Sequence, residues 1–197
     1  MKSIFSTPLW VTKLSNLEAM NDLVDISYKT RDVEVAHEKP KIVRSNSGQS
    51  WHSELNFAGS FSSIGISKEV TLCFNRCAQE YGFDIKEAQI TYWSIITSKY
   101  GYNRRHNHAG SLLSGVLYLR VPEKSGRLIF TDPRPGKTYE PSIGMTKSNI
   151  DSLQMCVDPV EGLFVVFPSF LEHEVEMTYS DEDRIIVSFN MTPLSAN

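Results

Sequence analysis

The chain has 197 residues, of which 41% are hydrophobic and 22% charged, and its formal net charge is −3. These values are typical of a globular domain with its own core, and they exclude a largely disordered chain. Three cysteines are too few for a disulfide scaffold, and the slight acidity argues against a general nucleic-acid-binding protein. No apolar run could cross a membrane, and the N-terminus lacks the apolar segment of a signal peptide. We therefore expect one cytoplasmic domain over residues 1–197.

The first part of the chain, about 1–87, is expected to be helical and extended. Pro8 excludes a helix interior near the start, whereas Ser15 and Glu18 have the spacing of a capping box that opens a first helix. Polar residues over 31–64 indicate loops with a short strand.

A second helix is predicted over residues 67–81. Ser67 is the expected N-cap, and Gly82 is the expected stop. Cys73 and Cys77 lie one turn apart on this helix, and without a second Cys or His pair nearby they are expected to pack in the core.

From about residue 88 the pattern changes to β-branched and aromatic runs separated by turn signals. The predicted strands cover 89–100, 112–121, 126–131, 162–167 and 184–191. Strands that follow helices without alternating with them indicate a mainly β (α+β) fold, an antiparallel sandwich or barrel, with the helices packed on one sheet. The long segment 132–158 is expected to be a lid or binding loop.

Three histidines are the candidate metal ligands. His106 and His108 are two residues apart, so on an extended backbone both rings face the same side. His173 comes much later, just before the last strand. Imidazole nitrogens suit Fe, Zn, Cu or Ni. The alternative for the pair is two exposed loop histidines beside Arg104 and Arg105.

Arg184 opens the last strand and is the candidate anion-binding residue. Strand alternation puts Arg184, Ile186 and Ser188 on one face. A guanidinium on an inward face suits a carboxylate, to which Ser188 and Tyr118 could add hydroxyl groups. The alternative is an exposed Arg184 paired with Asp181 or Asp183.

These residues occur in segments that resemble the iron(II)- and 2-oxoglutarate-dependent oxygenases, especially a small family from marine bacteria and phages. The matching segments are HNHAGSLLSGVLYL (106–119), SGRLIFTDPR (125–134), GLFVVFPSFLEHEV (162–175) and DRIIVSFN (183–190), with weaker likeness in FSTPLW (5–10) and SNSGQSWHS (45–53). The resemblance covers most of the chain and is densest over 90–190.

The resemblance implies a double-stranded β-helix, or jelly-roll, with its core at about 88–193. It implies that His106 begins the metal motif, that His173 is its distal histidine, and that Arg184 and Tyr118 bind the 2-oxoglutarate C5 carboxylate. With His108 at the second position of the motif, we expect His106, His108 and His173 to hold Fe(II), and Ser188 to help bind the cosubstrate. The implied reaction is decarboxylation of 2-oxoglutarate to succinate and CO₂ with hydroxylation of a C–H bond. A phage-encoded copy would work in the host cytoplasm.

The sequence departs from the usual His-x-Asp/Glu motif at His108. Three neutral imidazoles would leave Fe(II) with its full charge of +2, which puts redox tuning and even hydroxylation in question. Asp132 is a carboxylate that could complete the site, although an Asp before Pro133 more commonly starts a turn. Glu172 and Glu174 flank His173 and are expected to point to the opposite face.

The other candidate residues are expected to have lesser roles. His37 and His52 are not expected to be ligands, although His52 could line the mouth of the pocket. Trp93 is expected on the helix-packing face. Arg134 and Lys137 are expected to be solvated, with contact to an anionic substrate as the alternative.

The leading hypothesis is an Fe(II)/2-oxoglutarate oxygenase, a hydroxylase of a small molecule or a protein side chain, with no membrane or nucleic-acid partner and with a homodimer as one expected assembly. Two hypotheses compete with it. One is a cupin-type three-histidine dioxygenase that does not use 2-oxoglutarate. The other is a non-catalytic jelly-roll module whose histidines hold zinc or nothing.

Overall fold

The computed structural model describes residues 5–36, 49–134 and 153–194. In chain order its elements are β1 (Trp10–Lys13), α1 (Leu17–Ala36), β2 (Ser50–His52), a 3₁₀ turn (Phe61–Ser63), α2 (Ser67–Glu80), β3 (Ala88–Thr97), β4 (Asn103–His106), β5 (Leu113–Arg120), β6 (Leu128–Thr131), β7 (Gln154–Val157), β8 (Leu163–Pro168), β9 (His173–Val175) and β10 (Arg184–Pro193). No helix among these residues is both long and apolar enough to span a bilayer.

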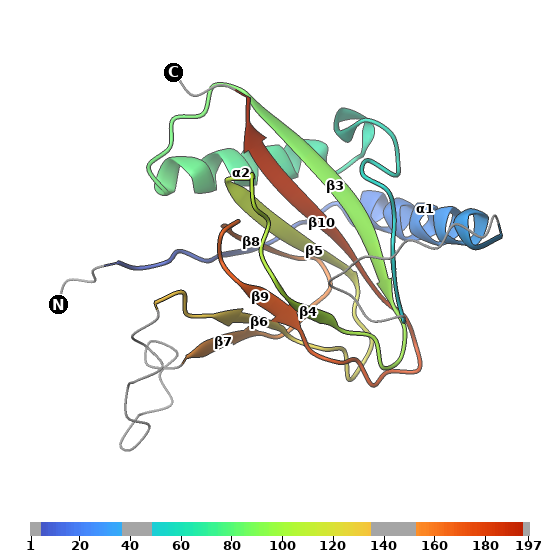
Figure 1. Cartoon of the computed structure of the whole chain (residues 1–197). Helices are drawn as coiled ribbons and strands as arrows, with labels where there is room; N and C mark the ends of the chain where they lie inside the picture. The colour runs from blue at the N-terminus through green and yellow to red at the C-terminus, as the bar shows by residue number, and fades with distance from the viewer. Residues whose placement is uncertain (1–4, 37–48, 135–152, 195–197) are drawn as a thin grey trace, which may run out of the picture.

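The strands form two antiparallel sheets (Figure 1). The larger has the order β1-β8-β5-β10-β3-β2 and the smaller the order β4-β9-β6-β7. Apolar side chains from both sheets, such as Ile95 and Val116 from one and Leu128 and Phe130 from the other, pack in one buried cluster. The expected mainly β, jelly-roll architecture is therefore confirmed, and β1 and β2 join the larger sheet from the first part of the chain.

Strand alternation divides the larger sheet into two apolar faces. On β10, the side chains of Ile185, Val187 and Phe189 belong to the core cluster that includes the buried residues of both helices. Ile186, between them, belongs to the cluster between the sheets. Both helices therefore cover one face of the six-stranded sheet, as expected (Figure 1), and its other face is left to the smaller sheet and the site.

The helix ends agree only in part with the sequence. α2 does stop at Gly82, whose φ of +94° is favourable only for glycine. However, Ser67 is the first helical residue rather than the N-cap, because Ile66 occupies that position. At α1 the side chain of Asn16 accepts a hydrogen bond from the Ala19 amide at 3.1 Å, so Asn16 caps this helix in place of the predicted Ser15–Glu18 box.

Two further expectations on the β region were wrong. Trp93 and Ile95 face the space between the sheets rather than the helices. The segment 132–158, expected to be a loop, includes β7, which pairs with β6. Residues 135–152 of this segment, with Lys137 among them, lie outside the described part of the chain. Four short strands, β1, β4, β7 and β9, were not predicted as strands.

Candidate metal centre

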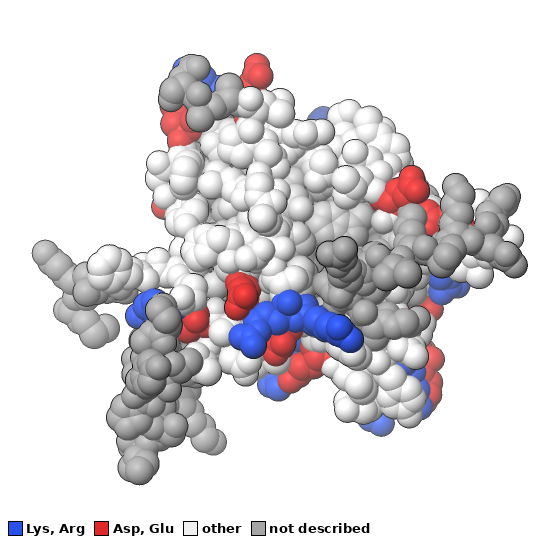
Figure 2. All heavy atoms as spheres, in the orientation of Figure 1, with Lys and Arg blue, Asp and Glu red and all other residues white. Residues whose placement is uncertain are grey.

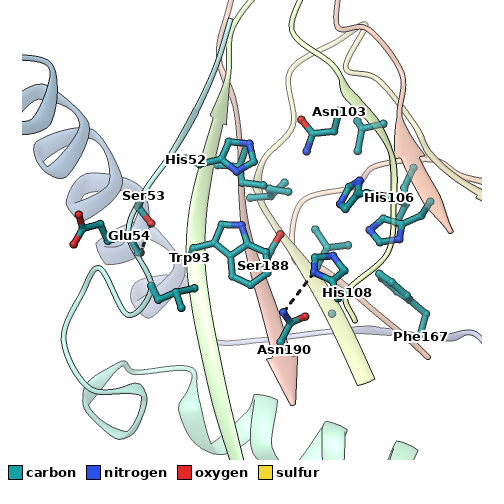
Figure 3. Close-up of a pocket in the computed structure, with 18 residues that line it drawn as sticks. His52, Ser53, Glu54, Trp93, Asn103, His106, His108, Phe167, Ser188 and Asn190 are labelled. Atoms are coloured by element: carbon teal, nitrogen blue, oxygen red, sulfur yellow. Dashed lines mark hydrogen bonds between the residues drawn. The ribbon is translucent and has the colours of Figure 1, made fainter. Parts of the chain in front are cut away.

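A cavity of about 710 Å³ lies between the two sheets. Its walls are largely apolar, and Glu54 is the single Asp, Glu, Lys or Arg among the described residues that line it. The lining residues are His52, Ser53, Glu54, Leu55, Trp93, Ile95, Asn103, His106, His108, Gly115, Val116, Leu128, Phe167, His173, Val175, Ile186, Ser188 and Asn190. His52 and Trp93 come from one wall, and His106 and His108 lie across the cavity from them (Figure 3).

The structure brings His106, His108 and His173 together. His106 ends β4 and is paired in register with His173, the first residue of β9. The ring centroids are 4.4 Å apart for His106 and His173, and 5.2 Å apart for each pair that includes His108. One ligand atom from each residue lies within 4.8 Å of the others, a spacing that one metal ion can bridge. The expectation that the i and i+2 rings face one point is therefore met, and the pair does not consist of exposed loop histidines.

Backbone carbonyls orient two of the three rings. Nδ1 of His106 lies 2.7 Å from the carbonyl oxygen of Arg104, and Nδ1 of His173 lies 3.0 Å from that of Leu171. A carbonyl oxygen can only accept, so each Nδ1 donates its proton and each Nε2 keeps its lone pair. Both rings therefore present an acceptor nitrogen, which is the form that binds a metal.

Burial keeps the site neutral. Loss of hydration lowers the pKa of His173 to about 3 and that of His108 to about 4, and it also lowers the pKa of His106. The neighbouring histidines add to the shifts at His173 and His108, since each disfavours a second positive charge. Metal binding near neutral pH therefore does not have to displace protons from these ligands.

The nearby carboxylates do not join this cluster. Asp132 accepts hydrogen bonds from the backbone and side chain of Arg134, at 3.0 and 2.9 Å. This is the turn expected for an Asp before Pro133, and the side chain of Arg134 takes part in it. Glu172 is exposed, and its carboxylate lies 3.9 Å from Arg105. The cluster found among the described residues consists of the three histidines.

Arg184 is buried at the start of β10 and is 1% exposed. Its Nη1 donates to the carbonyl oxygen of Gly126 at 3.1 Å, while Nε and Nη2 are buried without a hydrogen-bond partner. Burial lowers the pKa of this guanidinium, and the neighbouring Tyr118 opposes the shift. Burial also raises the pKa of Tyr118 to about 12, so its phenol stays neutral.

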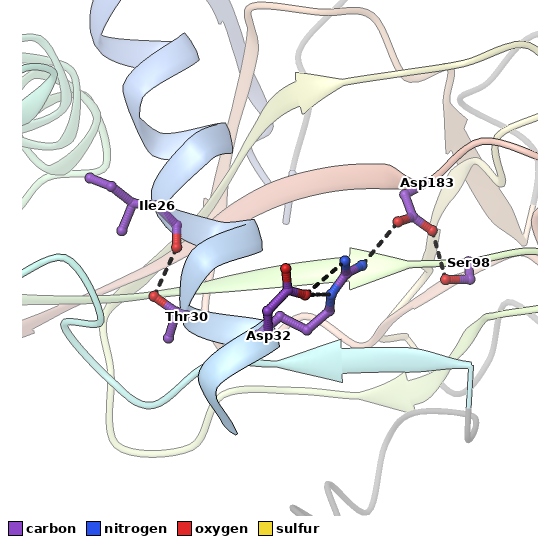
Figure 4. A network of polar contacts seen from close by, with 6 residues as sticks. Ile26, Thr30, Asp32, Ser98 and Asp183 are labelled. Atoms are coloured by element: carbon purple, nitrogen blue, oxygen red, sulfur yellow. Dashed lines mark hydrogen bonds and ion pairs between the residues drawn. The ribbon is translucent and has the colours of Figure 1, made fainter. Parts of the chain in front are cut away.

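The acidic residues before β10 bind other partners, so the alternative of an exposed, paired Arg184 is wrong. Asp183 binds Arg31 of α1 at 3.1 Å and accepts a hydrogen bond from Ser98 at 2.6 Å (Figure 4). Asp181 pairs with Lys99 at 2.6 Å. The contacts of Asp183 tie this turn to α1 and to the end of β3, whereas the Lys99–Asp181 pair is exposed and contributes little to its position.

Ser188 and Arg184 lie at different places along β10. Four residues separate them, which is about 13 Å of strand. Ser188 lines the cavity near Trp93 and His108 (Figure 3). Arg184 and Tyr118 do not line it, but Ile186, which follows Arg184 by two residues and pairs with Tyr118, does.

Three further polar residues on the inner faces of the sheets were not predicted as site residues. Thr97 pairs with Arg184 in register, and His52 pairs with Ile95 one step along the same face. Asn103 starts β4 on the opposite sheet. All three are buried, and Thr97 Oγ1, His52 Nε2 and Asn103 Oδ1 have no hydrogen-bond partner. Of these three, only His52 was singled out from the sequence, as a residue that could line the pocket, and it does so. His37 lies outside the described residues.

The outer surface seen in Figure 2 has basic and acidic side chains next to one another, and much of its upper part is uncharged. This face has no broad area of a single sign. The candidate anion-binding group is instead the buried guanidinium of Arg184, with its two unpartnered nitrogen donors.

Comparison with known proteins agrees with this geometry. Residues 91–190 match the model of the family described as "Putative 2OG-Fe(II) oxygenase". A search of curated protein sequences finds no match.

Solved structures share the fold at low identity. A prolyl-4-hydroxylase from Pseudomonas putida aligns over 96% of this chain and 95% of its own, with a TM-score of 0.60 and 16% identity. A Trichoplax adhaerens prolyl hydroxylase in complex with a hypoxia inducible factor peptide aligns over 96% of this chain and 87% of its own, with a TM-score of 0.57 and 13% identity. HygX from Streptomyces hygroscopicus, solved with nickel and 2-oxoglutarate, aligns over 95% of this chain and 84% of its own, with a TM-score of 0.57 and 9% identity.

Proposed function

Because the chain belongs to the 2OG-Fe(II) oxygenase family, we propose that it hydroxylates a substrate bound in the cavity between its sheets, with Fe(II) held by His106, His108 and His173. 2-Oxoglutarate would lie between these histidines and Arg184. The products would be succinate, CO₂ and the hydroxylated substrate.

The three histidines fit a divalent transition metal. Imidazole nitrogen is an intermediate donor that binds Fe(II), Ni(II) and Zn(II) alike. Two of the rings already have their Nδ1–H groups bound to carbonyl oxygens, which is the usual outer-shell arrangement of a metal-bound histidine. Three protein ligands leave the remaining coordination positions for the cosubstrate and O₂.

Arg184 fits the far carboxylate of the cosubstrate. A buried guanidinium with two unpartnered donors is costly, unless an anion completes its hydrogen bonds. The C5 carboxylate of 2-oxoglutarate can accept from Nε and Nη2 together, because the planar fork of the guanidinium matches a carboxylate. The neutral phenol of Tyr118 can donate a further hydrogen bond to the same group.

The residues between the two ends would bind the rest of the cosubstrate. Thr97 lies beside Arg184 on the inner face and offers a hydroxyl group. Ser188 lies nearer the histidines, so we assign it to the middle of the cavity rather than to the C5 carboxylate. Apolar walls such as Phe167, Val116 and Ile186 exclude water from this space.

Bound Fe(II) would supply the activation of O₂ that couples decarboxylation of 2-oxoglutarate to oxidation of the substrate. The chain itself holds the reacting groups in place. The carbonyls of Arg104 and Leu171 keep Nε2 of His106 and His173 unprotonated, and Arg184 fixes one end of the cosubstrate.

The observation that carries this proposal is the pair of unpartnered donors on Arg184, on the same sheet face as the cavity. These unpartnered donors favour the proposed function over the cupin-type alternative, in which three histidines bind metal but no internal cation is required. They also argue against a purely structural metal site, since a structural site gives no reason to bury an unpaired guanidinium.

The test is succinate formation from 2-oxoglutarate with Fe(II) and ascorbate, without substrate and with a panel that includes proline-containing peptides and free amino acids. Prolyl peptides enter the panel because two of the similar structures are prolyl hydroxylases. Wild-type protein should form succinate and His173→Ala should not. A folded wild-type protein that binds Fe(II) but shows no cosubstrate binding would contradict the proposal and favour the cupin-type alternative.

A further inference from the structure

His108 obtains its orientation from a different source than the other two histidines. Nδ1 of His106 and of His173 each contacts the carbonyl two residues earlier in the chain. Nδ1 of His108 instead lies 3.4 Å from Nδ2 of the Asn190 side-chain amide, on β10 (Figure 3). The residue that departs from the usual carboxylate motif is thus the one whose orientation depends on a distant strand.

Asn190 is itself held by the buried hydroxyl group of Ser114, which in turn contacts that of Ser169. Ser114 Oγ lies 2.9 Å from Oδ1 of Asn190 and 2.8 Å from Oγ of Ser169. Ser114 and Ser169 are 1% and 0% exposed, so the chain of hydrogen bonds is shielded from solvent. Ser169 also accepts a hydrogen bond at its carbonyl from the backbone amide of His108, at 2.9 Å. This series of hydrogen bonds therefore positions both the backbone and the ring of His108.

We propose that Asn190 is the positioning residue for His108, and that its side-chain carbonyl accepts the Nδ1 proton so that Nε2 faces the metal. This inference rests on the proposed function. With Nδ1 directed at Asn190, Nε2 is the nitrogen left for the metal. It can bind only if it is unprotonated, which places the proton on Nδ1 and requires an acceptor there.

The Asn190 side chain supplies that acceptor when its amide group rotates by a half-turn, which brings Oδ1 to the place where Nδ2 now faces His108. The oxygen and nitrogen of an Asn side chain have nearly the same size and exchange places when the amide rotates by about 180°. The hydroxyl groups can follow, because Ser114 and Ser169 can each donate or accept. After this rotation Nδ2 of Asn190 donates to the hydroxyl group of Ser114, and that hydroxyl group donates to Ser169. All three histidines would then carry their proton on Nδ1 and bind through Nε2.

The test uses Co(II) as the probe, added to the metal-free full chain and followed by calorimetry and by visible absorption. Asn190→Leu removes the acceptor and should weaken Co(II) binding about 10- to 100-fold, the usual range for loss of an outer-shell partner. Asn190→Asp keeps an acceptor and should bind within a few-fold of wild type. Thr192→Ala, the next residue on the same strand face, loses only a hydroxyl contact with Ser111. The contact of Ser111 with His108 runs between backbone atoms and should persist, so this variant should bind like wild type.

A second measurement separates positioning from folding. Nitrogen-15 spectra of the metal-free protein should show His108 protonated on Nδ1 in the wild type and a mixture of tautomers in Asn190→Leu. Equal Co(II) affinity of Asn190→Leu and wild type would overturn the inference, as would loss of binding in a folded Asn190→Asp. Failure of the wild type itself to bind Co(II) would instead overturn the proposed function.

Discussion

Replacing Arg184 with methionine should make the ligand-free protein more stable and at the same time abolish its response to 2-oxoglutarate. Methionine has a similar length and no charge. The guanidinium is 1% exposed, makes one hydrogen bond, to Gly126, and leaves Nε and Nη2 without partners. The described residues place no carboxylate against it, because Asp181 and Asp183 bind Lys99 and Arg31.

The magnitude follows from these groups. Each buried unpartnered donor costs about 1–3 kcal/mol, so removal of two should add about 2–6 kcal/mol to the free energy of unfolding. Loss of the bond to the Gly126 carbonyl subtracts about 1–3 kcal/mol. The midpoints of these ranges give a net expected gain of about 2 kcal/mol, or a Tm higher by roughly 4–8 °C for a domain of this size. Cosubstrate affinity should fall by about 3–5 kcal/mol, roughly 10²- to 10⁴-fold.

The assay is thermal and urea unfolding of both proteins, with and without 2-oxoglutarate in the presence of Zn(II) or Ni(II), together with calorimetric titration. 2-Oxoglutarate should raise the Tm of wild type and leave that of Arg184→Met unchanged. Lys99→Met, which breaks an exposed ion pair with Asp181, is the control and should keep the response. A ligand-free Arg184→Met that is less stable than wild type, or one that still responds to 2-oxoglutarate, would refute the reasoning.

The remaining predictions concern the histidines and the core. His108→Asp, which restores the common motif, should keep both metal binding and succinate formation, whereas His108→Ala should lose them; equal loss in both variants would contradict the assignment. In metal-free protein, the folded-state pKa values of His52 and His108 (about 4) and His173 (about 3) lie below the unfolded value of about 6.5. Stability should therefore be complete above pH 6.5 and fall as the pH drops toward 4, by about 2 kcal/mol per histidine at pH 5; a urea midpoint that does not change between pH 7.5 and 5 would disprove this. Phe74→Ala, on the buried face of α2, should lower the free energy of unfolding in urea by about 3–5 kcal/mol and leave Co(II) affinity unchanged, because Phe74 packs on Phe164 on the side of the sheet away from the histidines.

Strand alternation in the sequence was enough to place most of the site. The i and i+2 spacing of His106 and His108 predicted that their rings face one point, and the structure agrees. The alternation along β10 placed Arg184 and Ile186 on the inner face, opposite to Ile185 and Val187. These features depend only on the two-residue period of a strand, which any register preserves.

The features that depend on register were not predicted. Trp93 faces the cavity rather than the helices, because both faces of the central strands are buried and apolar, so composition does not distinguish them. Thr97 lies beside Arg184 only because β3 and β10 pair at this offset. Asn190 reaches His108 from a strand more than 80 residues later in the chain. One sequence contains no signal for such long-range pairings.

The charges of the site explain why a third histidine can stand where a carboxylate is usual. On the proposed function, Fe(II) held by three neutral imidazoles would keep a charge of +2, and the buried guanidinium of Arg184 would add +1. A bound 2-oxoglutarate dianion would then leave a net charge of +1, whereas a carboxylate ligand in place of one imidazole would leave zero. In a buried cavity charges act with little screening, so this arrangement favours the dianion more strongly than the common motif does. The same attraction applies to succinate, also a dianion but with no keto oxygen to bind the metal. The cost of the third histidine should therefore appear in the release of product as well as in the tuning of the metal.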